Sequence, residues 1–169
     1  MTEKIVITGS SGLIGRNLVK ELLSRGCELI CIDRKPMDVA RLLDGQEGVS
    51  RISCHTWDKV ATSSFREELE GTKAVVHLAG EPVLGLWTSW KKRRIFNSRV
   101  ETTELLVRII ESLHKKPSLF ISAGATGYYG DRNDELLVES SGPGRGFLTD
   151  VCMAWEEAGA KVEQQGCRF

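Results

Sequence analysis

The sequence predicts an α/β protein: a doubly wound parallel sheet covered by helices on both faces, in three α/β/α layers. Strand-like apolar runs alternate with helical patterns along most of the chain, which is typical of a parallel sheet with right-handed crossovers. The 169 residues are 41% hydrophobic and no polar spacer divides them, so we expect one domain over residues 1–169. The expected strands are residues 4–8, 28–32, 49–53, 74–78 and 118–122.

The first expected strand leads into a glycine-rich turn, in which residues 8–15 read TGSSGLIG. Gly9 permits a tight turn, Gly12 lets a phosphate approach the backbone, and Gly15 lets the next helix lie close on the strand. The free N–H groups and the dipole of that helix favour an anion. A glycine triplet alone also fits an ordinary turn, but the strand before it and the helix after it favour a dinucleotide site. The residues expected to hold the pyrophosphate are Gly9, Ser10, Ser11, Gly12, Leu13, Ile14 and Gly15.

Two helices in the first half of the chain have recognisable ends. The first begins at Leu13 and has Gly26 as its expected C-cap. A shorter one begins in a capping box formed by Ser64 and Glu67, and Gly71 closes it.

The second half of the chain predicts one long helix and a final one. Thr88 or Ser89 caps the long helix, which runs to about His114. The final helix spans residues 147–165 and leads into residues 167–169, which look like the opening of another strand. Because a sheet strand that has only begun is an unusual natural end, we expect a fragment or a shortened gene product.

Charge and cysteine content exclude several function classes. Lysine plus arginine number 23 and so do aspartate plus glutamate, so neither nucleic acid nor an anionic membrane is an expected partner. The chain has neither a spanning apolar stretch nor a charged leader before one, and we therefore expect a cytoplasmic protein. The five cysteines contain no Cys-x-x-Cys pair, which favours free thiols over a zinc site or a disulfide framework.

Several segments resemble the extended short-chain dehydrogenase/reductase family. The turn at residues 8–15 and the sequence VHLAG at residues 76–80 carry the resemblance. The branch is that of the nucleoside-diphosphate-sugar epimerase-like proteins, which the segments LAGEP (78–82), NSR (97–99), ATGYYG (125–130) and WE (155–156) resemble. The resemblance covers essentially the whole chain and implies a Rossmann-type fold, although relatives carry a carboxyl-terminal substrate region that this chain lacks.

The resemblance also implies a function and further cofactor contacts. It implies an NAD- or NADP-dependent oxidoreductase or epimerase acting on a nucleotide-sugar or small carbonyl substrate. Arg99 stands where relatives commonly hold an asparagine, and it either reaches a phosphate or carboxylate or is a surface arginine. The basic run at residues 91–94 is either a basic patch or, by default, a solvated first helical turn. The cofactor-contacting residues added by the resemblance are Leu78, Ala79, Gly80, Glu81 and Arg99.

The end of the second strand bears on the choice between NAD and NADP. Asp33 ends that strand, where a carboxylate accepts hydrogen bonds from the adenosine ribose and repels a 2′-phosphate. Arg34 follows it, and a guanidinium there binds a 2′-phosphate. We expect NAD to be slightly favoured, since the carboxylate acts at the site itself. By resemblance Asp58 reaches the adenine amino group, and a solvated loop carboxylate fits it equally well.

Catalytic residues are harder to find. Family enzymes use a Tyr-x-x-x-Lys pair on the helix after the fifth strand. In this chain Leu148 or Phe147 stands at the position of the tyrosine, and Cys152 stands at that of the lysine. The loop after the fifth strand offers hydroxyl groups instead. The candidate catalytic residues are Ser122, Thr126, Tyr128 and Tyr129. Two functions therefore remain open: a dinucleotide-dependent enzyme, and a dinucleotide-binding module without turnover.

A homodimer is the last expectation. The long helix carries more apolar positions than one stripe facing a sheet requires, and the surplus predicts a partner across a two-fold helix face. An exposed sheet edge is a second candidate contact. The apolar positions are Ile95, Val100, Leu105, Leu106, Ile109, Ile110 and Leu113.

Overall fold

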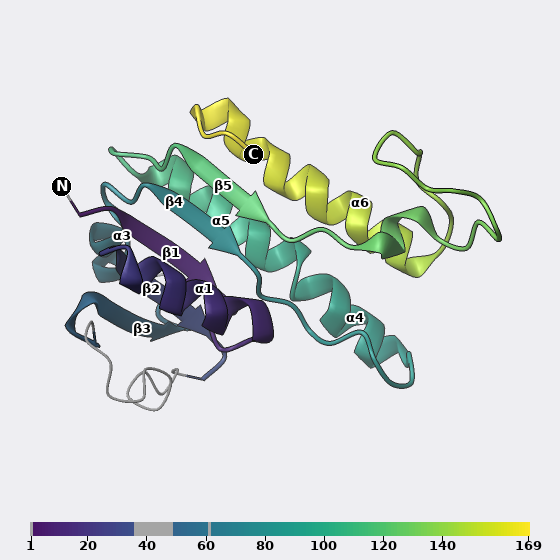
Figure 1. The fold of residues 1–169 in the computed structure, drawn as a ribbon, viewed down its shortest axis with the longest axis horizontal. Coiled ribbons are helices and arrows are strands. Elements are labelled where there is room, and N and C mark those ends of the chain that lie inside the picture. Colours follow the sequence, from purple (N-terminus) through teal and green to yellow (C-terminus); the bar gives the residue numbers. More distant parts are fainter. Residues whose placement is uncertain (1, 36–48, 61) are drawn as a thin grey trace.

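The computed structural model describes residues 2–35, 49–60 and 62–169, and its centre is a five-stranded sheet. All the strands are parallel, in the order β3-β2-β1-β4-β5, and their arrows point the same way in Figure 1. The strands are β1 (Lys4–Thr8), β2 (Glu28–Asp33), β3 (Ile52–Thr56), β4 (Ala74–His77) and β5 (Leu119–Ser122). The predicted α/β fold is confirmed, and four of the strands lie within one residue of their expected bounds.

The third strand was placed too early. Residues expected to open it form a 3-10 turn, η1 (Val49–Arg51), and β3 continues to Thr56. The register explains the shift, because β3 must lie beside β2 so that Leu29 meets Ile52 and Asp33 meets Thr56. A run of alternating residues does not contain that long-range information.

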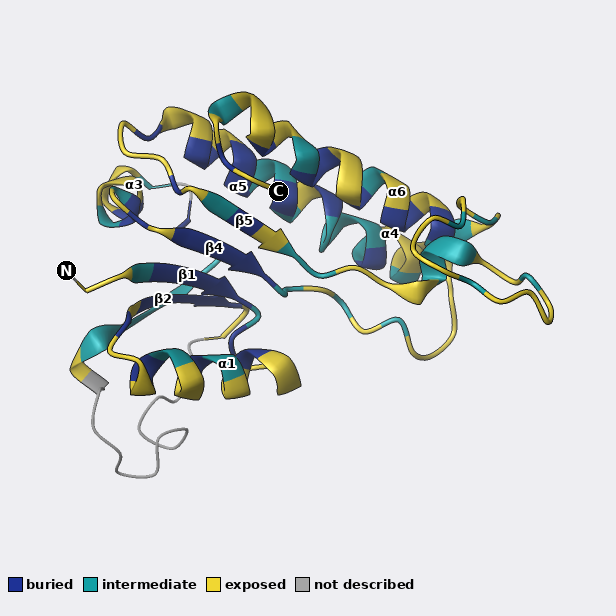
Figure 2. Cartoon of the chain, turned by 45° about the horizontal axis from the view of Figure 1, so that its top comes forward, coloured by how far each residue is buried: buried dark blue, intermediate teal, exposed yellow. Residues whose placement is uncertain are grey.

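Helices cover both faces of the sheet (Figure 2). On one face α1 packs over inward-facing side chains of β1, β2 and β4, such as Ile7, Leu29 and Val76. On the other face α3 and α5 pack over Val6 and Phe120. The helices are α1 (Leu13–Ser24), α3 (Ser63–Leu69), α4 (Ser89–Asn97), α5 (Val100–Ser112) and α6 (Phe147–Ala160), with 3-10 turns η2 (Thr126–Tyr129) and η3 (Lys161–Gln165). The alternation of strand side chains between two apolar layers gives the predicted three-layer architecture.

The expected long helix is two helices, because α4 ends at Asn97 and α5 begins at Val100. Ser98 at the break accepts a hydrogen bond from the backbone N–H of Glu81 at 2.8 Å. The Thr103 hydroxyl donates to the carbonyl of Arg99 at 2.6 Å. These side-chain bonds compete with the helical pattern at the break.

The caps differ in part from expectation. Thr88 is the N-cap of α4, and its hydroxyl accepts from the N–H of Lys91. In α3 the N-cap is Thr62, whose hydroxyl accepts from the N–H of Phe65, so the predicted capping box at Ser64 is wrong. Thr62 lies two residues earlier and holds the extended backbone that an N-cap requires.

The end of the chain lies beside β5 (Figure 1). Arg168 forms a parallel bridge with Leu119, and its carbonyl accepts from the N–H of Phe120 at 2.8 Å. The expected opening of another strand is therefore present at the outer edge of β5. Among the described residues, no helix is both long and apolar enough to span a bilayer.

Candidate cofactor site

The parallel sheet brings five loops to one edge. Because all strands share one direction, the segments after β1, β2, β3, β4 and β5 meet at their carboxyl ends. The chain moves from β1 outward to β3 and then returns to the other side of β1 with β4, so the strand order reverses between β1 and β4. In open α/β sheets ligands bind in the crevice at such a switch point.

The glycine turn after β1 has the geometry of a phosphate cradle. Gly9 has φ +71°, and a Cβ there would lie 2.8 Å from the backbone nitrogen of Ala79. A Cβ at Gly15 would overlap the carbonyl oxygen of Gly9, so these two glycines are needed for packing. A Cβ at Gly12 would meet only the Gly9 carbonyl, at 3.2 Å, so the space on its outer side is open.

The amino end of α1 is free to receive an anion. Gly12 is its N-cap, and no side chain of the described residues caps it. The first N–H groups of the helix are thus available to a ligand, as the sequence predicts. Leu13 and Ile14 in the first turn are 76% and 67% exposed, although both are large and apolar. This surface fits the pyrophosphate of a dinucleotide, because open backbone donors and an apolar cover lie together.

Asp33 is buried and anchors the glycine turn. Its carboxylate accepts hydrogen bonds from the Ser10 hydroxyl, from the Ser11 hydroxyl at 2.6 Å and from the Ser11 N–H at 3.2 Å. A carboxylate has about four lone-pair sites, so it can also accept from a ribose. Asp33 therefore has a positioning role in the turn that its place at the end of β2 did not reveal.

Glu81, after β4, is the centre of an ion-pair cluster. Its carboxylate contacts Lys91 Nζ at 2.8 Å, Arg94 Nη2 at 2.9 Å and Arg34 Nη1 at 3.1 Å. The pKa of Glu81 lies below its ordinary value, chiefly because the Lys91 ammonium donates a hydrogen bond to it and secondarily because of Arg94. The default expectation of a solvated basic turn at residues 91–94 is therefore only partly right.

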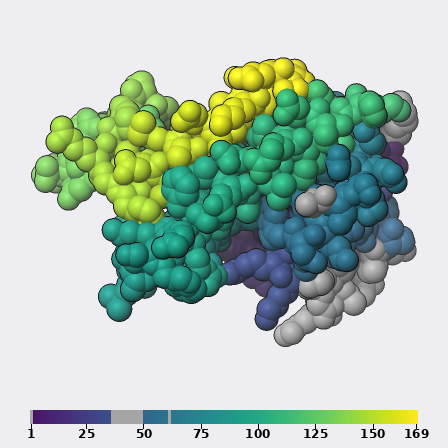
Figure 3. Space-filling model, turned by 180° about the vertical axis from the view of Figure 1, so that it is seen from behind, coloured from purple at the N-terminus to yellow at the C-terminus, as the bar shows by residue number. Residues whose placement is uncertain are grey.

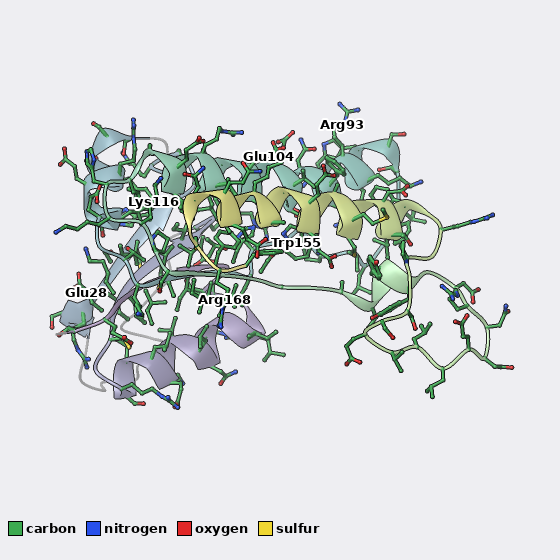
Figure 4. All side chains as sticks on the ribbon, turned by 90° about the horizontal axis from the view of Figure 1, so that it is seen from above. Glu28, Arg93, Glu104, Lys116, Trp155 and Arg168 are labelled. Atoms are coloured by element: carbon green, nitrogen blue, oxygen red, sulfur yellow. The ribbon has the colours of Figure 1, made fainter. Side chains whose placement is uncertain are left out.

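Two cations of that basic turn do point elsewhere. Lys92 lies over the ring of Phe147, with its Nζ 5.3 Å from the centroid. Arg93 points away from α4 at the outer edge of the molecule (Figure 4). The four basic residues thus act as separate groups rather than as one patch.

Arg99 supports the loop after β4 through hydrogen bonds to backbone carbonyls. Its Nη1 donates to the carbonyl of Glu81 at 3.0 Å and to that of Ile95 at 3.2 Å. The guanidinium also lies over the ring of Trp155 of α6, 5.3 Å from its centroid (Figure 4 labels Trp155). Arg99 is half-buried against these groups, so it differs from a solvated surface arginine.

His77 is a satisfied core residue. Its Nδ1 is 2.6 Å from the Thr8 hydroxyl, and its Nε2 is 3.3 Å from the Thr102 hydroxyl. The Thr102 hydroxyl donates its proton to the carbonyl of Ser98, so it accepts from Nε2–H, and Nδ1 accepts from the Thr8 hydroxyl. Burial lowers the pKa of His77 to about 4, so the ring is neutral. The Thr8–His77 pair fixes β1 against the loop after β4.

The candidate catalytic hydroxyls lie together in the loop after β5. Thr126, Tyr128 and Tyr129 form η2, and the two tyrosine rings meet edge to face with centroids 5.2 Å apart. Ser122 ends β5, and its hydroxyl is 3.4 Å from the Ala123 carbonyl. All of these residues except the exposed Thr126 are half-buried.

The helix after β5 faces this loop without acid–base groups. A Cβ at Gly127 would lie 3.1 Å from the Cβ of Leu148, so the two residues pack closely. Cys152 Sγ is 3.9 Å from the Ala125 carbonyl, and burial raises the pKa of this thiol. The positions expected for the tyrosine and lysine pair therefore hold a packed leucine and a neutral thiol.

Asp58 lies in the turn after β3, at the same edge of the sheet. The pKa of Asp58 is below its ordinary value, chiefly because of a hydrogen bond from the Thr56 side chain. Among the described residues, no group of three or more histidine, cysteine, aspartate or glutamate side chains is arranged to hold a metal ion.

Sequence reasoning missed several residues that shape the site. Ser98 binds the backbone of Glu81, while Lys91 and Arg94 orient its side chain. The basic run at residues 91–94 and the segment at residues 97–99 were visible in the sequence, but their partner Glu81 was not. The contacts themselves cross 10 to 17 positions of sequence, which no local pattern records.

Comparison with known proteins agrees with this geometry. The profile of the NAD dependent epimerase/dehydratase family matches residues 5–145. The chloroplastic epimerase family protein SDR39U1 homolog of Arabidopsis thaliana is 27% identical over 162 residues, which are 95% of this chain and 45% of that protein.

Two solved structures are similar in fold. The human epimerase family protein SDR39U1, crystallised with NADPH, has a TM-score of 0.73 and 26% identity, covering 92% of this chain and 48% of that one. The nucleoside-diphosphate sugar epimerase from Corynebacterium glutamicum has a TM-score of 0.71 and 32% identity, covering 99% of this chain and 32% of that one. The chain thus spans half or less of each of these proteins. It belongs to the NAD dependent epimerase/dehydratase family.

Proposed function

We propose that the chain is the NAD(P)-binding part of an oxidoreductase or epimerase. The observation that carries the proposal is the open cradle at Gly12, where the uncapped α1 faces the switch point of the sheet. Gly9 to Gly15 would hold the pyrophosphate, Asp33 the ribose and Asp58 the adenine amino group. Leu78 to Gly80, supported by Arg99, would line the path toward β5.

The proposed substrate is a nucleotide sugar or a small carbonyl compound. The family to which the chain belongs, and the nucleotide-sugar epimerase among its structural neighbours, support this class. A bound nicotinamide cofactor would supply hydride transfer. Ser122 and Thr126 would orient the substrate oxygen by hydrogen bonds, and the Tyr128 or Tyr129 hydroxyl would hold a proton for it.

A dinucleotide-binding module without turnover is the second candidate. The observation that favours it is the pairing of Leu148 and Cys152 against the loop after β5, where neither side chain can exchange a proton with a sugar carbon. Transfer of label from isotopically labelled NADPH or NADH to any of a panel of nucleotide sugars and aldehydes would exclude this candidate.

Cofactor binding is tested by the substitution Gly12→Val. The isopropyl group would occupy the space of the pyrophosphate, so we expect the variant to fold but to bind neither NAD nor NADP. For the unmodified protein, cofactor at a hundredfold excess over Kd should stabilise the fold by about 2.7 kcal/mol, which a thermal-shift series detects. Gly142→Val is the matched control, because a Cβ at Gly142 has no neighbour within 4 Å. Unchanged binding by Gly12→Val would refute the assignment of the site.

We also propose a cytoplasmic location and a homodimer. The five cysteines contain no Cys-x-x-Cys pair, which supports a reducing compartment. The expected apolar surplus of the long helix does not supply the contact, because all seven of those positions are buried within the protomer or packed against its core. The chain end already pairs with the outer edge of β5, so the better candidate is the face of β5 at Ile121, which is 45% exposed.

A further inference from the structure

The ion pair between Arg34 and Glu81 crosses the mouth of the proposed cofactor site. Arg34 follows β2 and Glu81 lies in the loop after β4, and these strands flank β1 on opposite sides. The contact between Arg34 Nη1 and Glu81 Oε2, at 3.1 Å, therefore passes over the carboxyl end of β1, where the glycine turn begins. Figure 3 shows the segment after β2 lying next to α4 on the surface. A dinucleotide that lies along this edge must meet the ion pair.

Glu81 is the fixed partner of this pair. Its N–H donates to Ser98 Oγ and its carbonyl accepts from Arg99, so its backbone is held on both sides. Lys91 and Arg94 hold its carboxylate, and the side chain is only 11% exposed. Arg34 is 69% exposed and has Glu81 as its only ion-pair partner among the described residues. A competing anion would therefore displace Arg34 rather than Glu81.

The charges of the cluster leave room for such an anion. In the described part of the chain three cations, Arg34, Lys91 and Arg94, meet the single carboxylate of Glu81, so two positive charges are unbalanced. Asp33, beside Arg34 in sequence, keeps its negative charge but directs its carboxylate at the hydroxyl groups of Ser10 and Ser11. A phosphate monoester carries between one and two negative charges near neutral pH, and a guanidinium binds it in a fork. The 2′-phosphate of NADP has this chemistry, whereas NAD offers only a hydroxyl.

We propose that Glu81 is a specificity-determining residue that competes with the 2′-phosphate of NADP for Arg34. With NAD, Arg34 stays paired with Glu81. With NADP, Arg34 leaves Glu81 for the 2′-phosphate, and the ion pair that is lost weakens NADP binding relative to NAD. The inference rests on the proposed cofactor binding and deepens it, since it assigns the balance between the two cofactors to one carboxylate beyond Asp33.

The test is the substitution Glu81→Gln, with Kd for NAD and NADP measured by isothermal titration calorimetry on the whole chain. The amide removes the charge but keeps the shape, so Arg34 is released and the repulsion of the phosphate falls. We expect Kd for NADP to fall about fivefold and Kd for NAD to change by less than about twofold. Glu21→Gln is the matched control, because it removes an exposed ion pair with Arg25 on α1 and should change neither Kd.

A second variant separates release of Arg34 from general electrostatics. In an Arg34→Gln background, Glu81→Gln should improve NADP binding far less, because no guanidinium is left to release. Equal improvement for both cofactors, weaker NADP binding, or a full gain without Arg34 would overturn the inference. If the unmodified chain bound neither cofactor, the proposed function itself would fail, which is a different result from an unchanged ratio.

Discussion

At the scale of single residues, buried polar groups connect the sheet to the candidate site. The Thr8 hydroxyl accepts a hydrogen bond from the N–H of Ala79 and donates one to Nδ1 of His77. These two bonds hold the loop after β4 against β1. Thr102 continues the chain of hydrogen bonds from His77 to the carbonyl of Ser98 in the break before α5. The position of Glu81 thus depends on a neutral His77, which directly precedes the proposed cofactor-contacting residues Leu78, Ala79 and Gly80.

This dependence predicts that stability falls when the solution is acidified. The pKa of His77 is about 4 in the folded chain against 6.5 in its ordinary state, so the unfolded chain binds more protons between these values. Stability is therefore complete above pH 6.5 and is lost as the pH falls toward 4. For this group alone we expect a loss of about 2 kcal/mol between pH 7 and pH 5, measured by urea unfolding.

The control for this prediction is a second histidine. His77→Asn should reduce the slope of stability against pH in this window, whatever its effect at neutral pH, whereas exposed His114→Gln should leave the slope unchanged. Glu70 and Asp58 have lowered pKa values, so the stability that they contribute is lost only at lower pH. They do not account for a loss between pH 7 and pH 5. An unchanged slope in His77→Asn would contradict the assignment.

At the scale of elements, the ends of the helices decide how the loops are held. Thr62 caps α3 and also donates to the carbonyl of Lys59, so it joins the helix to the turn that carries Asp58. Ser64, the cap expected from sequence, lies inside the helix and is exposed. Glu67, three residues after Ser64, made Ser64 the expected cap, and only the extended backbone at Thr62 identifies Thr62 as the actual cap.

The assignment of this cap gives a paired prediction. Thr62→Ala should lower the free energy of unfolding by about 1 kcal/mol, because an N–H at the amino end of α3 loses its acceptor. Ser64→Ala should change it by less than about 0.5 kcal/mol, as is usual for an exposed residue without such a role. Urea unfolding of both variants checks the difference, and a larger effect at Ser64 would restore the capping box.

The break between α4 and α5 could not be predicted from the spacing of apolar residues. Apolar spacing runs through residues 95–113 without interruption, so a single helix was the natural prediction. The helix breaks because Ser98 and Arg99 bind the loop after β4, a contact made across the sheet edge. A periodic pattern of apolar residues contains no information about such long-range contacts, so it cannot predict a helix end that depends on them.

At the scale of the whole molecule, sequence periodicity was enough for the sheet, the two helical layers and the place of the cradle. These features follow from local rules: buried strands are apolar runs, and glycines stand where a Cβ would collide, as at Gly9 and Gly15. The partners of Asp33, Glu81 and Arg34 could not be predicted in this way, because each contact joins loops that only the folded sheet brings together.

The way in which two copies would associate is also a whole-molecule property. The outer face of α5 carries charged residues such as Glu101, Arg108 and Glu111. The apolar residues of α5 face the interior of the protomer. The face of β5 is different. Ile121 shares a sheet face with Leu119, but Leu119 packs against the apolar cluster on that face, whereas Ile121 is 45% exposed. The outer edge of β5 is already bonded to Arg168 at Leu119 and Phe120, so the exposed apolar face around Ile121 is the part of β5 that a second copy would contact. Two-fold symmetry makes such a contact self-complementary.

We therefore predict a homodimer at micromolar concentration that depends on β5 rather than on the helices. Ile121→Lys should give a monomer in sedimentation equilibrium, because a charge on each copy would meet its mate across the two-fold axis. Met153→Lys is the matched control, since Met153 is a similarly exposed apolar residue, at 46%, but lies on α6. Dissociation by the Met153 variant alone would assign the contact to the helix face. An 18.7 kDa species in the unmodified protein across this range would refute the dimer.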